Sequence, residues 1–131
     1  MARQVRVDLA AASRDSILAL RRVERQQELI QRLHAAHGTR LQLNTLADDL
    51  GVSARTLARD VERLRLSGVP LRTHRGRGGG VSLSHTGALS PLTLDLPEAA
   101  ALISSLAVLG PSVSHSATSA MQKLTAALQP R

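Results

Sequence analysis

The sequence predicts a mainly helical fold with a small β-hairpin, followed by a C-terminal helical hairpin. Three observations carry this prediction. Apolar residues recur at the three- and four-residue spacing of amphipathic helices over most of the 131 residues. One short segment alternates in polarity around a glycine-rich turn, as β-hairpins do. Phe, Tyr and Trp are absent, so Leu, Val, Ile and Ala supply the core, which suits packed helices.

The N-terminal part of the chain predicts a tail and then a helix. Residues 1–13 have no clear apolar period, and we expect a flexible N-terminal tail there. A helical pattern begins near Ser13 and ends at Gly38, since glycine closes helices readily. Its apolar face consists of Ile17, Leu20, Val23, Ile30 and Leu33. The pattern leaves open whether this segment is one long helix or two shorter ones.

Two short helices are expected to meet across residues 51–53. Asn44 is a plausible N-cap of the first, and Gly51 ends it. Ser53 caps the second, which Ser67 and Gly68 close. Their apolar positions are Leu46, Ala47 and Leu50 in the first helix, and Leu57, Val61 and Leu64 in the second. Each set lies on one helix face, so both helices bury a stripe.

The next segment predicts a β-hairpin with a basic tip. Residues 69–74 and 81–83 have extended or alternating character. Residues 75–80 lie between them and contain four glycines, which permit positive φ angles at little steric cost. Arg75 and Arg77 are the charged residues of this turn.

The C-terminal part predicts a linker and a helical hairpin. Residues 85–96 begin with a stretch rich in Ser, Thr, Gly and Pro and are expected to be the linker. Residues 97–131 contain two apolar helical patterns broken at Gly110-Pro111, with Pro97 as the first helical position. These apolar faces need a cover. Either a second copy of the chain supplies it, giving a homodimer, or the hairpin packs back onto the long N-terminal helix.

The positive charge is confined to the first two-thirds of the chain. Residues 1–85 carry 15 Arg against 8 acidic residues, whereas residues 86–131 carry two basic and two acidic residues. The net charge of +7 therefore belongs to the first part. Arginine binds phosphate and guanine through paired hydrogen bonds, so a polyanionic partner is expected. The alternative is a basic surface that only contacts solvent.

The order helix, short helix, glycine turn, helix and Arg-tipped hairpin is typical of a winged helix-turn-helix, predicted here over residues 14–84. The helix at residues 53–67 would enter the major groove of duplex DNA, with the wing at residues 69–83 beside it. Arg55 or Arg59 would bind guanine, and Thr56 a phosphate or a thymine methyl group. The expected DNA-binding residues are Ser53, Ala54, Arg55, Thr56, Arg59, Arg63, Arg75 and Arg77.

Asp60 is out of place on such a helix, and we assign it to orienting Arg59 or Arg63, or to an intramolecular salt bridge. His74 and His85 flank the wing, where a protonated imidazole would contact phosphate. His34 and His37 lack further ligands for a metal site. With no cysteine, no catalytic triad pattern and no nucleotide-binding motif, we expect no enzyme activity, no cofactor and no metal.

The residues also carry a family resemblance. The runs 46–64, 68–71 and 76–83 resemble the N-terminal module of bacterial DeoR-like, WYL-domain-containing regulators, and residues 92–99 resemble the connector after its wing. The resemblance implies operator binding by a dimer. The sequence departs from the family pattern in having no Trp or Tyr for the WYL sensor, and in Val81, where the family has an aromatic residue. The chain is therefore either part of a longer regulator or a compact variant.

These observations together predict a DNA-binding transcriptional regulator that acts as a homodimer. No signal peptide or membrane span is apparent, so the cytoplasm, at the nucleoid, is the expected location. The alternative is a winged-helix protein-interaction module that uses the C-terminal apolar helices. Single-stranded RNA binding is a third candidate, weakened because no aromatic side chain is present to stack on bases. The sequence names no effector ligand.

Overall fold

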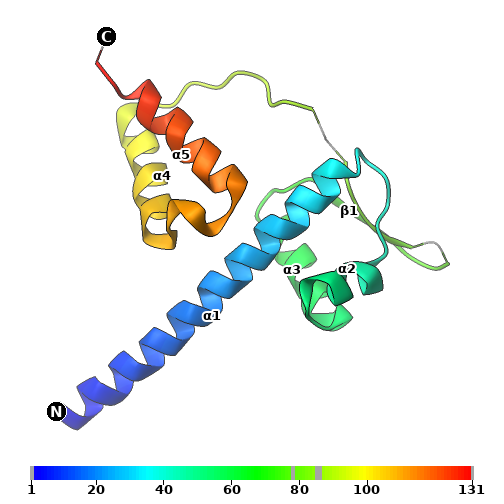
Figure 1. The fold of residues 1–131 in the computed structure, drawn as a ribbon, viewed down its shortest axis with the longest axis horizontal. Helices are drawn as coiled ribbons and strands as arrows, with labels where there is room; N and C mark the ends of the chain where they lie inside the picture. Colours follow the sequence, from blue (N-terminus) through cyan, green and yellow to red (C-terminus); the bar gives the residue numbers. More distant parts are fainter. Residues whose placement is uncertain (1, 78, 85–86, 131) are drawn as a thin grey trace. The chain divides into compact units, whose positions relative to one another are not determined.

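The computed structural model describes residues 2–77, 79–84 and 87–130, which form helices and one two-stranded sheet (Figure 1). The elements are α1 (Ala2–Ala35), α2 (Leu43–Leu50), α3 (Ala54–Leu66), β1 (Leu71–His74), β2 (Gly80–Leu83), α4 (Leu96–Leu109), the short 3₁₀ helix η1 (Pro111–Val113) and α5 (His115–Ala127). The mainly helical fold with a β-hairpin is thus confirmed. Residues 25–89 form one compact unit, called the central unit below.

Helix α1 is a single long helix, which settles the choice that the sequence left open. The flexible tail predicted for residues 1–13 is wrong for residues 2–13, because these residues form the first turns of α1. The physical reason is that no glycine or proline interrupts residues 2–35, and Ala10 to Ala12 strongly favour helix. A missing apolar period therefore does not exclude a helix where local propensity is high.

The core of the central unit joins all its elements. Helix α1 contributes residues of its C-terminal half, and the sheet contributes one face. The buried apolar residues are Leu29 and Leu33 from α1, Leu46 and Ala47 from α2, Leu57 and Val61 from α3, and Leu71, Val81 and Leu83 from the sheet. Burying one large aliphatic side chain stabilises a fold by about 1.5–3 kcal/mol. This cluster therefore fixes α3 against α1 and the sheet.

The turn between α2 and α3 follows the predicted glycine. Gly51 closes α2 with a φ of 72°, and the Val52 amide donates to the Ala47 carbonyl over 3.0 Å. Ser53 is the N-cap of α3, as predicted. The expected N-cap Asn44 is wrong, because α2 begins at Leu43 and Gln42 is the capping residue. The three residues 51–53 thus connect α2 to α3.

Strands β1 and β2 pair antiparallel, with Arg72 opposite Ser82. Leu41 forms an isolated antiparallel β-bridge with Val81, in which the two backbones exchange two hydrogen bonds of 2.9 Å. Gly80 permits this approach: a Cβ there would lie 2.2 Å from the Leu41 carbonyl oxygen. Backbone hydrogen bonds therefore connect the wing to the segment that precedes α2.

Helices α4 and α5 pack together as the predicted helical hairpin. Asp95 caps α4 reciprocally with Glu98, through hydrogen bonds of 2.8 and 2.9 Å. Pro97 therefore occupies the second helical position, one later than predicted. Ala99 and Ala117 are the buried apolar residues of this hairpin in the described chain. None of the described helices is long and apolar enough to cross a membrane.

Candidate nucleic-acid interface

The outer face of α3 carries a row of arginines. Arg55, Arg59 and Arg63 recur every four residues and are exposed, while Leu57 and Val61 on the opposite face are buried. No ion pair or hydrogen bond within the described part of the chain engages Arg55 or Arg59. Two guanidinium groups on this helix therefore remain available to a ligand.

The orientation predicted for Ala54 is wrong. Ala54 is half-buried and packs against the core, whereas the sequence pattern predicts that it lies on the outer face. It precedes Leu57 by three residues and thus shares the buried side of α3. Only the part of Ala54 that remains exposed can therefore contact a ligand.

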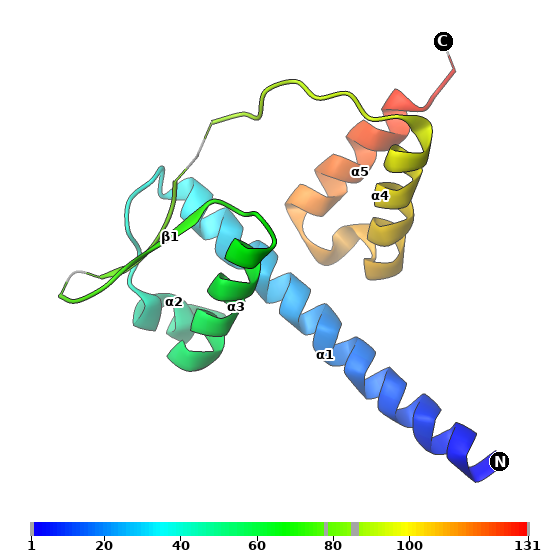
Figure 2. The ribbon, with the colours of Figure 1, turned by 180° about the vertical axis from the view of Figure 1, so that it is seen from behind.

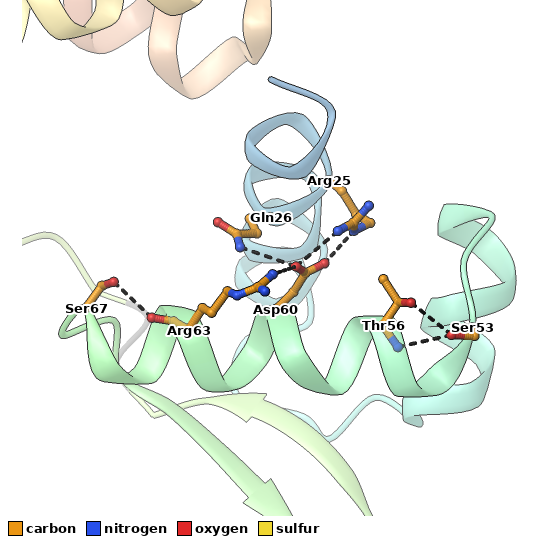
Figure 3. Close-up of polar contacts among 7 residues, drawn as sticks. All are labelled: Arg25, Gln26, Ser53, Thr56, Asp60, Arg63 and Ser67. Atoms are coloured by element: carbon orange, nitrogen blue, oxygen red, sulfur yellow. Dashed lines mark hydrogen bonds and ion pairs between the residues drawn. The ribbon is translucent and has the colours of Figure 1, made fainter. Parts of the chain in front are cut away.

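The start of α3 is organised by two hydroxyl groups. The Ser53 hydroxyl oxygen accepts a hydrogen bond from the Thr56 amide over 3.1 Å, and the Ser53 hydroxyl donates to Thr56 Oγ1 over 3.0 Å (Figure 3). Thr56 Oγ1 is the acceptor, so its own proton can be donated outward. The end of the helix that carries the positive dipole is thus both capped and lined with donors.

Asp60 lies on the side of α3 that faces α1 and is completely buried. Its carboxylate accepts hydrogen bonds from Arg25 Nε, from an Arg25 terminal nitrogen over 3.1 Å and from Gln26 Nε2 over 3.3 Å (Figure 3). Hydrogen bonding to Asp60 raises the pKa of Arg25. The predicted intramolecular salt bridge is confirmed, and it withdraws the negative charge of Asp60 from the outer face of α3.

Arg63 connects this buried group to the surface. Its guanidinium lies 3.8 Å from Asp60 Oδ1, while 49% of its side chain stays exposed (Figure 3). The distance is that of an ion pair rather than of a close hydrogen bond. Arg63 is therefore held in place by the buried carboxylate, in contrast to Arg55 and Arg59.

Sequence reasoning missed Arg25 and Gln26. Both belong to α1 and lie 35 and 34 positions before Asp60, so no local spacing connects them to it. The useful signal was the acid itself, because a carboxylate within a basic helix needs a partner. That signal predicts a partner without identifying it.

The wing carries the remaining predicted contacts. Arg75 and Arg77 are exposed in the turn between β1 and β2, and the hairpin projects beyond the helices of the central unit in both views (Figures 1 and 2). A Cβ at Gly79 would lie 2.5 Å from the His74 carbonyl oxygen, so this tight turn requires glycine there. The tip therefore presents two arginines with little side-chain bulk around them.

His74 lies on β1 and is hydrogen-bonded within the wing, and its predicted phosphate contact stays a prediction. Its Nε2 lies 2.9 Å from Ser82 Oγ. Desolvation lowers the pKa of His74, and the positive charges of Arg40 and Arg72 lower it further. The folded wing therefore disfavours the protonated form of His74. His85 lies outside the described residues.

The geometry defines a class of protein. The C-terminal half of α1, the crossed pair α2 and α3, and the hairpin β1–β2 around one core are a winged helix-turn-helix fold. In agreement, residues 25–81 match the family model of the HTH domain. This match supports a helix-turn-helix DNA-binding module in that part of the chain.

Among curated proteins, the chain is similar to the tRNA pseudouridine synthase D of Stutzerimonas stutzeri (strain A1501). The two are 45% identical over 64 residues, which are 48% of this chain and 17% of that protein. The chain thus spans about a sixth of the length of that relative. No solved structure shows a significant match to the chain.

Proposed function

We propose that this chain is a transcriptional regulator that binds a duplex DNA operator, with α3 in the major groove and the wing on the neighbouring backbone. The observation that carries the proposal is the pair Arg55 and Arg59, exposed and without an intramolecular partner in the described chain. A guanidinium in the major groove recognises guanine through O6 and N7. The neutralised Asp60 supports this assignment, because a free carboxylate there would repel phosphates.

We further propose that the protein acts as a homodimer through α4 and α5, as the resemblance to DeoR-like, WYL-domain-containing bacterial regulators implies. Large apolar side chains remain exposed on α4, with Leu102 at 46% and Val108 at 88%. Two-fold pairing would match an inverted-repeat operator. The protein would act on the chromosome in the cytoplasm, by binding rather than by catalysis and without a cofactor.

Two other functions compete with this proposal. The exposed apolar residues of α4 equally favour a protein-interaction module. The likeness to a tRNA pseudouridine synthase D makes a structured RNA the second competitor. The test therefore includes tRNA as a competitor, and the absence of any recovered DNA motif would favour the interaction module.

The test begins with selection of duplexes from a random library at near-physiological salt, with tRNA as competitor. An inverted repeat with half-sites about one helical turn apart is the expected result. Equal competition by tRNA, or the absence of any recovered motif, would contradict the proposal.

Variants then assign the contacts. Arg59→Ala should weaken operator binding about 10- to 100-fold, the effect of losing one paired base contact, and leave random duplexes little affected. Arg77→Ala should weaken all duplexes and reduce the salt slope by about one. Arg65→Ala is the matched control, because Arg65 lies on the same helix but is paired with Glu62 over 2.8 Å. Equal losses for Arg59→Ala on operator and random duplexes would refute base reading.

A further inference from the structure

The β1–β2 hairpin has two faces. The proposed function assigns no role to the residues of its outer face. Side chains alternate along paired strands, so Leu71, Val81 and Leu83 share the face that joins the core. Arg72 and Ser82 are paired across the strands on the other face, with His74 two residues along β1. The outer face is therefore polar and basic, and it is separate from the tip.

A hollow of about 260 Å³ lies on this outer face. It is lined by Arg40, Arg72, His74, Ser82 and Ser84, together with Gly38 and Leu83. Pockets for drug-sized molecules span about 300–1,000 Å³, so this hollow suits one small group. Its lining includes two guanidinium-bearing side chains and two hydroxyls but no carboxylate. Such a set favours a small anion.

The hydroxyl in the hollow is held in place. Ser82 is 5% exposed, and its Oγ lies 2.9 Å from His74 Nε2. If the ring nitrogen donates this hydrogen bond, the Ser82 proton is left to point at a ligand. Ser84 is fixed as well, since its hydroxyl donates to the Pro70 carbonyl oxygen over 2.8 Å.

Two positively charged side chains border the hollow. Arg40 and Arg72 both lower the pKa of His74, so both charges act on the same ring. Arg72 has no carboxylate partner in the described part of the chain. An anion in the hollow would interact favourably with both charges.

We propose that the outer face of the wing is a binding site for a tetrahedral oxyanion, a phosphate group, held by Arg40, Arg72 and the Ser82 hydroxyl. Guanidinium groups bind phosphate through charge-assisted hydrogen bonds, and the serine supplies a neutral donor. The phosphate has two sources, the backbone of bound DNA or inorganic phosphate. The first source rests on the proposed function, and the second does not.

The first arm of the test uses inorganic phosphate and the full chain. Sodium phosphate is added at constant ionic strength while NMR follows the His74 ring and the Arg72 side-chain NεH signal, with sodium chloride as reference. Saturable shifts and a raised pKa of His74 are expected. Arg72→Gln and Arg40→Gln should each weaken binding about tenfold, the loss of one charge-assisted hydrogen bond. Arg21→Gln, an exposed position on α1, is the charge-matched control and should bind normally.

The second arm measures the salt dependence of duplex binding for the same variants. A slope reduced by about one in Arg72→Gln and unchanged in Arg21→Gln assigns the site to a DNA phosphate. Phosphate binding with an unchanged slope supports the site with a free anion as its ligand. Shifts that chloride reproduces, or that survive both substitutions, overturn the proposal. If the wild type binds no duplex, the proposed function fails, and the phosphate arm still decides the site.

Discussion

The central unit and the α4–α5 hairpin are built from similar short helices but bury their apolar residues to different degrees. The central unit encloses Leu29, Leu33 and Leu57 completely. The hairpin buries only the small side chains of Ala99 and Ala117 within the described chain, and leaves Val108 at 88% exposure. Two antiparallel helices enclose less volume than three helices closed by a sheet. The comparison teaches that the central unit closes a core of large side chains, whereas the hairpin buries only small ones within the described chain.

The largest expected effect tests this contrast directly. Leu57→Ala should destabilise the central unit by about 4 kcal/mol, because a fully buried leucine is replaced by a cavity. Leu102→Ala, at a position 46% exposed on α4, should cost about 0.5 kcal/mol. Urea unfolding followed by circular dichroism, with hydrogen exchange to separate the two regions, measures both. Similar losses for the two variants would break the comparison.

The second effect concerns the buried ion pair that ties α3 to α1. Asp60→Ala should destabilise the central unit by about 3 kcal/mol, since it leaves the Arg25 guanidinium without its partner. Asp48→Ala removes an exposed carboxylate of α2 and should change stability by less than about 0.5 kcal/mol. The same unfolding measurement applies. A cost for Asp60→Ala no greater than that of the control would show that packing alone positions α3.

The smallest effect is a pH dependence in the wing. The folded protein lowers the pKa of His74 through desolvation and the charges of Arg40 and Arg72. The unfolded chain therefore takes up a proton first as the pH falls below about 6.5, and folded stability falls with it. His74→Gln should flatten this loss between pH 7 and pH 5. The urea midpoint, measured across that range, checks it, and a parallel decline in both proteins would contradict the assignment.

Much of the fold could be predicted because its signals are local. Gly51 and Ser53 specify the turn and the cap between α2 and α3 within a few residues of the groups that they bond. The glycines around Gly79 specify the wing turn in the same way. Residues 2–13 lack an apolar period, yet they are helical because alanine propensity is high and no glycine or proline interrupts them.

The candidate interface was predictable in part. The exposure of Arg55, Arg59, Arg75 and Arg77 follows from the apolar stripe and the turn. Only the structure shows that Ala54 packs against the core and that α1 is one helix from Ala2 to Ala35. Whether these arginines contact DNA stays a prediction for the selection experiment.

By itself the sequence determined the Gly51 turn, the Ser53 cap and the buried stripe of α3, and the concentration of arginine in the first two-thirds of the chain. Only the tertiary structure decided that Arg25 neutralises Asp60, and that Arg40 joins Arg72 around one hollow. The physical reason is distance along the chain. Caps and stripes act over about four residues, whereas these contacts join residues more than 30 positions apart, which only the closed core brings together.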